Sequence, residues 1–273
     1  MIIMVICFIL LAILAILCLL YLLILVRPGK KVTPDPILLG NYAHRGLHGN
    51  GIPENSLAAF ARACEEGFGI ELDVQLSRDG TVMVFHDYTL LRMTGRDQKL
   101  CELDASELSV LSLAGTDQTI PTLAQVLALV NGRVPLLVEL KGEDLNVALC
   151  EKVAKLLSDY QGPYCLESFN PLLIRKIKEY LPDAFRGQLY TNVCREKKKR
   201  TVLNLALTYM TLNFLAKPDF IAYNKEDRNS LPVRITTRLY HAPKFVWTVK
   251  TEEELALAHS LGEYPIFERQ FKD

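Results

Sequence analysis

The chain has 273 residues, with 31 basic and 31 acidic side chains, so its formal net charge is zero. This balance argues against a nucleic-acid partner, and the short basic run at 197–200 is interpreted as a solvated helix start. The seven cysteines are odd in number and include no C-x-x-C pair. This usage favours reduced thiols in a reducing compartment over a disulfide framework.

The first 26 residues differ from the rest, because positions 2–26 contain no charge, glycine or proline. As a helix this segment would be ~37 Å long, enough to cross a hydrocarbon layer of ~30 Å. No basic residue precedes the run and bulky side chains fill its end, so we predict a transmembrane helix at 1–26 rather than a cleaved or lipidated leader. Arg27, Lys30 and Lys31 follow it, which favours a single-pass protein of the cell membrane with a cytoplasmic globular part.

Residues 27–36 contain three prolines and a glycine and are predicted to form a short extended linker. Such a linker reaches at most ~33 Å, so the following domain would work close to the bilayer. The remaining residues, 37–273, have a length typical of one α/β barrel.

Short β-rich runs alternate with helical patterns through this domain. Strands are expected at 38–43, 69–75, 82–86, 134–140, 164–167, 185–190, 220–223, 245–249 and 264–267. Helices are expected at 56–66, 122–130, 145–160, 171–181, 201–215, 225–237 and 251–261. The loop before residue 82 is too short for a parallel crossover, so 82–86 should form a hairpin with the strand before it.

The eight other strands, most of them followed by a helix, predict a (β/α)8 TIM barrel. A doubly wound open sheet is the alternative. The stretch G-L-H-G-N-G does not support it, because its glycines lack the dinucleotide-binding spacing G-x-G-x-x-G.

Acidic residues end two of the predicted strands. Glu71 and Asp73 are two apart, so both carboxylates face one side of a strand, and Glu139 ends another strand in the same way. Carboxylates that share a site repel one another, and a hard divalent cation relieves the repulsion. Three oxygen ligands without a Cys or His cluster suit Mg²⁺ or Ca²⁺ rather than zinc. The alternative is a set of surface acids on an edge strand.

Two histidines accompany these acids. His44 and Arg45 come where a strand ends and a loop begins, an arrangement suited to a phosphate. His86 ends the hairpin strand beside the acidic pair, so the two histidines can divide acid and base duties. Arg45 can fork onto phosphate oxygens, and Lys141 can supply a point charge. Trp247 either walls a substrate pocket or only packs.

These residues recur in a set of short motifs, and the chain resembles the glycerophosphodiester phosphodiesterase family from about residue 40 to 250. The matching motifs are His44-Arg45-Gly46, Pro53-Glu54-Asn55-Ser56, Glu71-Leu72-Asp73-Val74, Asp79-Gly80, Phe85-His86-Asp87, Ile120-Pro121-Thr122-Leu123, Glu139-Leu140-Lys141, Ser168-Phe169 and Trp247-Thr248-Val249. One departure is the end of the chain, 261–270, where the family usually has Thr-Asp before a proline.

The resemblance implies a (β/α)8 barrel and metal-dependent hydrolysis of a glycerophosphodiester to glycerol 3-phosphate and an alcohol. By position it implies that His44 and His86 are the acid–base pair and that Glu71, Asp73 and Glu139 hold the metal. It also implies that Arg45 and Lys141 contact the phosphate and that Glu54 and Asn55 support the site. The predicted anchor suggests a lysophospholipid as natural substrate. Alternatives are a phospholipase-D-like lipid phosphodiesterase and a catalytically silent barrel that binds headgroups.

Overall fold

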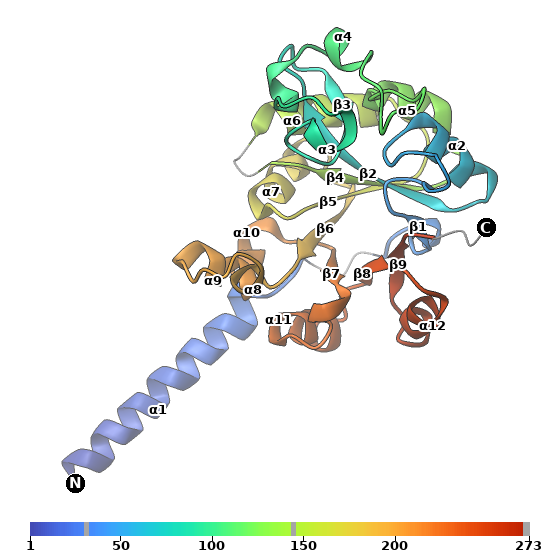
Figure 1. Ribbon diagram of the computed structural model, residues 1–273. Helices are drawn as coiled ribbons and strands as arrows, with labels where there is room; N and C mark the ends of the chain where they lie inside the picture. The colour runs from blue at the N-terminus through green and yellow to red at the C-terminus, as the bar shows by residue number, and fades with distance from the viewer. Residues whose placement is uncertain (30–32, 143–145, 270–273) are drawn as a thin grey trace.

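The computed structural model describes residues 1–29, 33–142 and 146–269 of the chain. A rounded α/β body carries a long N-terminal helix that projects away from it (Figure 1). Lys30 and Lys31 of the predicted linker, the start of the helix predicted at 145 and residues 270–273 lie outside the described residues.

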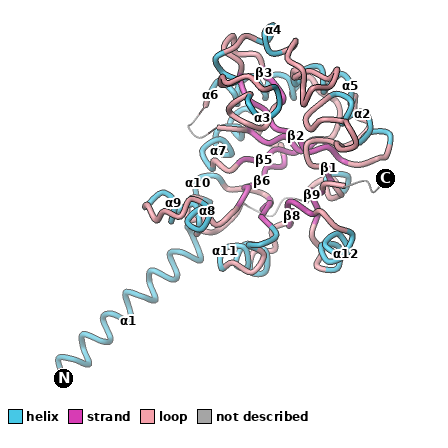
Figure 2. The backbone as a smooth tube through the Cα atoms, in the orientation of Figure 1, coloured by secondary structure: helices cyan, strands magenta, loops and turns pink. Residues whose placement is uncertain are grey.

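The body is a closed barrel of parallel strands, so the predicted TIM barrel is confirmed and the open sheet is wrong. Its first strand pairs with both the second strand and the last, which closes the ring (Figure 2). The barrel strands are β1 Tyr42–Ala43, β2 Gly69–Leu76, β4 Leu136–Leu140, β5 Tyr164–Ser168, β6 Phe185–Tyr190, β7 Phe220–Asn224, β8 Lys244–Val249 and β9 Tyr264–Phe267.

One further strand, β3 (Val82–Val84), lies outside the ring as the predicted hairpin partner of β2. It runs antiparallel, with Met83 opposite Gln75. The chain then passes through short helical segments before it returns to the outer layer of the barrel. These segments are α3 Leu91–Thr94, η3 Leu100–Glu102 and α4 Ala105–Leu108.

Helices cover the outside of the barrel, as alternating strands and helices require. They are α2 Leu57–Glu65, α5 Leu123–Val130, α6 Val147–Ser158, α7 Pro171–Tyr180, α8 Val193–Glu196, α9 Val202–Thr208, α10 Asn213–Ala216, α11 Leu231–Arg234 and α12 Glu252–Ser260. Ser56, Thr122 and Thr251 each accept a backbone N–H at a helix start, which satisfies one of the donors that a helix leaves free there.

Three predicted elements are shorter or broken in the structure. The strand expected at 38–43 is reduced to β1, because Asp35 caps a 3₁₀ turn, η2 (Pro36–Leu38), just before it. The helix expected at 201–215 divides into α9 and α10, and Met210 between them has a left-handed φ of 50°.

The helix expected at 225–237 is divided by Pro232. Because proline has no N–H to donate within a helix, a new helix, α11, starts around it after the 3₁₀ turn η4 (Lys225–Asp227). The chain continues from α11 into the π-helical turn η5 (Ile235–Leu239).

The inside of the barrel changes from aromatic to acidic along the strands. Near the N-terminal ends, the rings of Phe185, Phe220 and Phe245 pack against one another in tilted pairs, with centroid distances of 4.8 and 4.6 Å. Further along, carboxylates replace them, since Asp73 on β2 and Glu139 on β4 face each other in the register. The aromatic layer therefore closes the bottom of the barrel and leaves a polar site at the C-terminal mouth.

The N-terminal helix α1 (Ile2–Leu20) continues into a π-helical turn, η1 (Tyr21–Leu25). Together these 24 residues are long and apolar enough to cross a membrane. A signal sequence near an N-terminus can have the same length and composition.

The inner wall of the barrel yields a first prediction. A methyl group on Gly187 would lie 2.0 Å from a ring carbon of Phe220, whereas one on Gly40 would meet nothing within 4 Å. Gly187→Ala should lower the free energy of unfolding by about 1–3 kcal/mol, because the packed rings must move. Gly40→Ala is the matched control. The free energies of unfolding of the two variants are measured by urea denaturation in the same detergent. Equal stability of the two variants would contradict this packing.

Candidate active site

Three buried carboxylates meet at the mouth of the barrel. Glu71 and Asp73 point inward from β2, and Glu139 lies beside Asp73 on β4. One oxygen from each lies within 4.8 Å of the others, and the residues are 2%, 1% and 7% exposed. The structure therefore brings together the three predicted ligands in a cluster that can hold a metal ion.

Two cations contact this cluster. Lys141 Nζ lies 3.0 Å from Asp73 Oδ1 and 2.8 Å from Glu139 Oε1. The backbone N–H of Arg45 donates to Glu71 at 2.9 Å, and Arg45 Nε lies 3.5 Å from Asp73. The two residues predicted to contact phosphate therefore bind carboxylates in this structure, at the edge of the same site.

Burial controls the charge of the acids. It raises the pKa of Glu71 well above its usual value, and the neighbouring carboxylates of Asp73 and Glu139 add to the rise. Burial also raises the pKa of Glu139 to about 7, although Lys141 opposes it. For Asp73, burial acts in the same direction, but Lys141 and His86 outweigh it and lower the pKa. Burial therefore favours protonation of Glu71 and Glu139, and a bound divalent cation would oppose it.

His44 is held by the last segment of the chain. Its Nδ1 donates to Glu268 at 2.8 Å, and Glu268 also pairs with Lys250 at 2.9 Å. The bond to His44 lowers the pKa of Glu268, so an ionised carboxylate accepts the Nδ1 proton. Burial lowers the pKa of His44 itself, which keeps the ring neutral with a free lone pair on Nε2. That Nε2 lies 3.9 Å from Glu71 Oε2.

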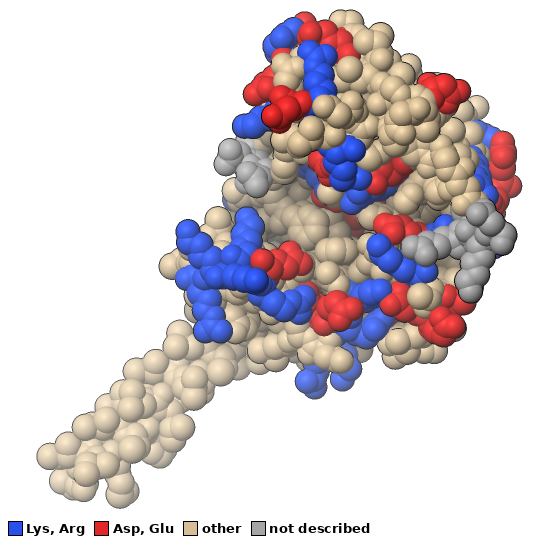
Figure 3. All heavy atoms as spheres, in the orientation of Figure 1, with Lys and Arg blue, Asp and Glu red and all other residues tan. Residues whose placement is uncertain are grey.

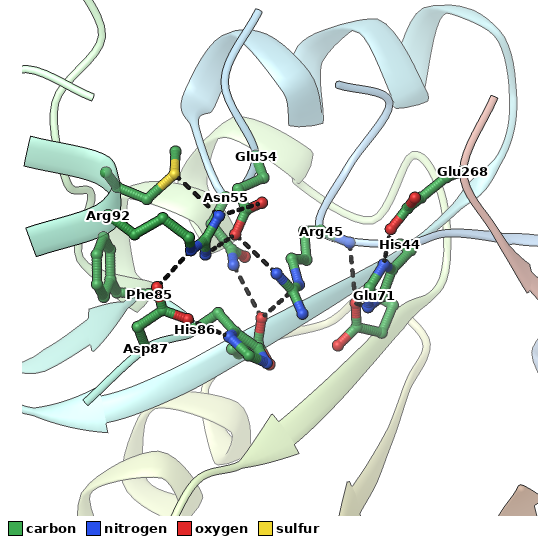
Figure 4. Close-up of polar contacts among 12 residues, drawn as sticks. His44, Arg45, Glu54, Asn55, Glu71, Phe85, His86, Asp87, Arg92 and Glu268 are labelled. Carbon is green, nitrogen blue, oxygen red and sulfur yellow. Dashed lines mark hydrogen bonds and ion pairs between the residues drawn. The ribbon is translucent and has the colours of Figure 1, made fainter. Parts of the chain in front are cut away.

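His86 has a similar carboxylate partner. Its Nδ1 donates to Asp87 at 2.6 Å, and Asp87 in turn pairs with Arg92 at 2.5 Å. Arg92 also pairs with Glu54 at 2.6 Å, and Glu54 accepts from Arg45 at 2.8 Å. Figure 4 shows this continuous chain of hydrogen bonds running from His86 to Arg45. Glu54, predicted as a supporting residue, lies between the two arginines.

Two amides fix the loops that carry these groups. Gln75 Nε2 lies 2.8–3.1 Å from three successive carbonyl oxygens, 85–87, and its two N–H groups hold the loop of His86 against β2. Asn55 Nδ2 donates to Asp73 at 2.8 Å. Arg45 and Asn55 both have a left-handed φ of 54°, and the N–H of Asn55 donates to the carbonyl of Arg45. These bonds set the directions of the site side chains.

A cavity of about 310 Å³ opens beside the cluster and is large enough for a small phosphodiester. Its walls include His86, Lys141 and Phe169. Trp247 packs edge-on against Phe169, with ring centroids 5.6 Å apart, and its Nε1 donates to the carbonyl of Ala222. Trp247 therefore borders the cavity through Phe169.

Two residues of the site, Glu268 and Arg92, were not predicted from the sequence. Glu268 follows β9 directly, and the same rule that selected Glu139 at a strand end would have selected it. Arg92 carries no local signal, because its partner Glu54 lies 38 residues away in another loop. Glu167 on β5 lies opposite Glu139 and is 1% exposed, and its Oε2 has no hydrogen-bond partner among the described residues. Burial raises the pKa of Glu167 well above its usual value.

A closed parallel barrel with titratable side chains gathered at the C-terminal ends of its strands has the architecture of a TIM-barrel enzyme. The glycerophosphoryl diester phosphodiesterase family matches residues 44–268, most of the chain. The chain therefore belongs to this family of phosphoric diester hydrolases.

Individual relatives agree with this assignment. The chain is 37% identical over 161 residues to a glycerophosphodiester phosphodiesterase of Caldanaerobacter subterraneus, a match of 54% of this chain and 65% of that protein. It is 30% identical over 150 residues to human glycerophosphodiester phosphodiesterase 1, covering 50% of this chain and 44% of that protein. The chain thus spans about half to two thirds of the length of these curated relatives.

Solved structures share the fold. An Oleispira antarctica phosphodiesterase in complex with sn-glycerol 3-phosphate superposes with a TM-score of 0.70 at 23% identity, over 85% of this chain and 94% of that chain. A glycerophosphodiester phosphodiesterase from Thermotoga maritima superposes with a TM-score of 0.64 at 25% identity, over 85% and 94%.

The bond between His44 and Glu268 leads to a second prediction. Glu268 raises the pKa of His44 against the effect of burial, so Glu268→Gln, which removes the charge, should lower that pKa further. NMR titration of the histidine rings in the metal-free full chain measures the shift, and His86 should not move. Glu252→Gln, an exposed acid of α12, is the control variant. An unchanged or higher pKa of His44 would show that Glu268 is not its partner in solution.

Proposed function

We propose that the chain hydrolyses glycerophosphodiesters to glycerol 3-phosphate and an alcohol. One observation carries the proposal: His44 and His86 stand on opposite sides of Arg45, and each Nδ1 is bound to a carboxylate (Figure 4). Both rings then keep a free Nε2 for proton transfer. Membership of the glycerophosphoryl diester phosphodiesterase family supports the same reaction.

The two histidines would act at opposite ends of the broken bond. One removes a proton from the attacking oxygen as it bonds to phosphorus, and the other gives a proton to the departing alcohol oxygen. Burial lowers the pKa of both rings, which favours the neutral form that the proton acceptor needs. The ring that protonates the alcohol must start as the imidazolium, so each turnover leaves one ring with a proton gained and the other with a proton lost. Glu268 and Asp87 then stabilise the imidazolium that forms on His44 or His86.

Arg45 and Lys141 would bind the phosphate. Lys141 lines the cavity, and Arg45 lies between the two histidines. Their carboxylate partners hold both cations in fixed positions, so little rearrangement is needed when a phosphate oxygen approaches. Trp247 would shape the cavity wall by supporting Phe169.

Glu71, Asp73 and Glu139 would hold a divalent cation, Mg²⁺ or Ca²⁺. The cluster fits such an ion because its oxygens converge within 4.8 Å, and because burial and the neighbouring carboxylates of Asp73 and Glu139 raise the pKa of Glu71, an energetic cost that a cation would lower. A bound cation would polarise a phosphoryl oxygen of the substrate.

We further propose that α1 and η1 are a retained membrane anchor for residues 37–273, with 27–36 as linker and the barrel on the cytoplasmic side. Val26 at the end of the span has no exposed surface, and Asn213 donates to its carbonyl at 3.0 Å. A segment removed by cleavage needs no such fit. Arg27 and the lysines after it follow the positive-inside rule. An anchored barrel suits a lipid-derived diester such as a lysophospholipid.

Turnover tests the acid–base assignment. The full chain in detergent should release glycerol 3-phosphate from glycerophosphocholine, and His44→Ala and His86→Ala should each lower kcat by about 10²–10⁴-fold. His259→Ala, an exposed histidine bound to Asn41, is the control and should stay fully active. A loss below about tenfold in either site variant would contradict its role.

The products also separate the alternatives. Lysophosphatidylcholine cleaved to choline and a lysophosphatidate would favour a phospholipase-D-like activity. No turnover of any diester, with phosphate esters still bound, would leave a silent headgroup-binding barrel.

Metal binding is measurable without turnover. Mg²⁺ or Ca²⁺ at about 100 times its Kd should stabilise the EDTA-stripped chain by about 2.7 kcal/mol in thermal unfolding. Glu71→Gln should abolish this shift while leaving the apo fold intact, because the raised pKa of Glu71 already favours its neutral form. Glu252→Gln is the matched surface control. A full shift in Glu71→Gln would show that the cation binds elsewhere.

A further inference from the structure

The end of the apolar helix is packed onto the side of the barrel. Val26 is fully buried there against Asn213, and the Tyr240 hydroxyl donates to the carbonyl of Leu22. The backbone N–H of Gly29 donates to the carbonyl of Pro218 at 2.7 Å. These bonds fix the direction of α1 relative to the barrel, so the barrel has one defined face beside the point where the helix leaves it.

Apolar side chains are exposed around this point. Val202 is 87% exposed and Leu203 60%, both at the start of α9, while Leu231 of α11 is 54% exposed and Leu239 of η5 is 56%. An open groove of about 450 Å³ joins the two groups, with Tyr21 of the helix as one of its walls. We call Val202, Leu203, Leu231 and Leu239 with this groove the junction face. Exposed apolar patches on a soluble surface usually mark a site of contact.

Basic side chains flank the junction face. Three lysines and an arginine, residues 197–200, are exposed just before Val202. None of the four forms an ion pair within the described parts of the chain. Arg234 and Arg238 are exposed on the other side. Figure 3 shows lysines and arginines gathered over the root of the N-terminal helix. The run at 197–200, interpreted from sequence as a solvated helix start, therefore lies beside an apolar surface.

We propose that the junction face is a second membrane contact, which rests on a bilayer containing anionic lipids around the end of α1. Its apolar side chains would enter the headgroup boundary, and its basic side chains would meet lipid phosphates, as in interfacial helices. The position of the junction face next to α1 favours a bilayer as its partner. The junction face adjoins the end of a helix long enough to span a bilayer, so a bilayer crossed by α1 must end beside it.

The contact has a consequence for the active site, which rests on the function proposed above. The β6–β7 connection that carries α8 and α9 starts at the C-terminal end of β6, the end of the barrel where the carboxylates gather. With α9 on the bilayer, that rim of the mouth lies at the level of the headgroups. A lipid-derived diester could then reach the mouth while its acyl chain stays in the membrane.

Tryptophan substitutions in the full chain test the contact. Val202→Trp and Leu203→Trp each add a fluorophore at an exposed position, and the signal of the parent, whose single tryptophan is Trp247, is subtracted. The matched control is Val110→Trp, 74% exposed in the loop after α4, across the barrel from α1 (Figure 1). Each variant is reconstituted into vesicles of phosphatidylcholine and phosphatidylglycerol with brominated acyl chains, which quench fluorophores at the boundary.

Quenching should be at least roughly twofold stronger at positions 202 and 203 than at 110. It should weaken when phosphatidylglycerol is omitted and in a chain that also carries Lys198→Glu and Lys199→Glu. Equal quenching at positions 202 and 110 would overturn the proposal. So would a dimer in detergent in which a second copy of the chain covers position 202. Fluorescence needs no turnover, so an inactive chain with strong quenching at 202 would reject the proposed function and keep the membrane contact.

Discussion

The site depends on the burial of like charges. Glu71, Asp73, Glu139 and Glu167 all lie in the mouth of the barrel at 7% exposure or less, and Lys141 and Arg45 are the cations that face them. Four acids and two bases leave an excess of negative charge in a poorly hydrated space, where repulsion is strong. Burial, with added repulsion from Asp73 and Glu139, raises the pKa of Glu71. A divalent cation would offset this excess, and protonation would offset it by removing charge from the carboxylates.

The barrel interior makes this arrangement possible. Aromatic rings fill the lower layer and exclude water from below, so the carboxylates are solvated only through the mouth. The parallel register then fixes their spacing, because Asp73, Glu139 and Glu167 occupy one level on three neighbouring strands. Rigid strands hold the acids, whereas loops hold the histidines, and Gln75 and Asn55 join the two by hydrogen bonds. The hydrogen-bonded strands thereby keep the mutually repelling carboxylates close together.

The sequence predicted the parts of the site that have local periodicity. Residues two apart on a strand share a face, so Glu71 and Asp73 could be paired, and Glu139 followed from the same rule. The partners of the histidines were harder, since Glu268 lies 224 positions from His44 and only closure of the barrel brings them together. The broken helices at 201–215 and 225–237 escaped prediction for a related reason. Helical patterning continues across Met210 and Pro232, but backbone conformation and the missing N–H do not allow one helix there.

The end of the chain, which departs from the family pattern in sequence, supplies this carboxylate. Glu268 follows β9 directly, and its carboxylate is the one that binds His44. The register of β9 with β8 is irregular, and Lys250, directly after β8, pairs with the same carboxylate at 2.9 Å. The pairing of β9 with β1 that closes the barrel therefore also places Glu268 where it orients His44. A substitution that loosens β9 should displace Glu268 and so disturb the orientation of His44, even when no catalytic side chain is replaced.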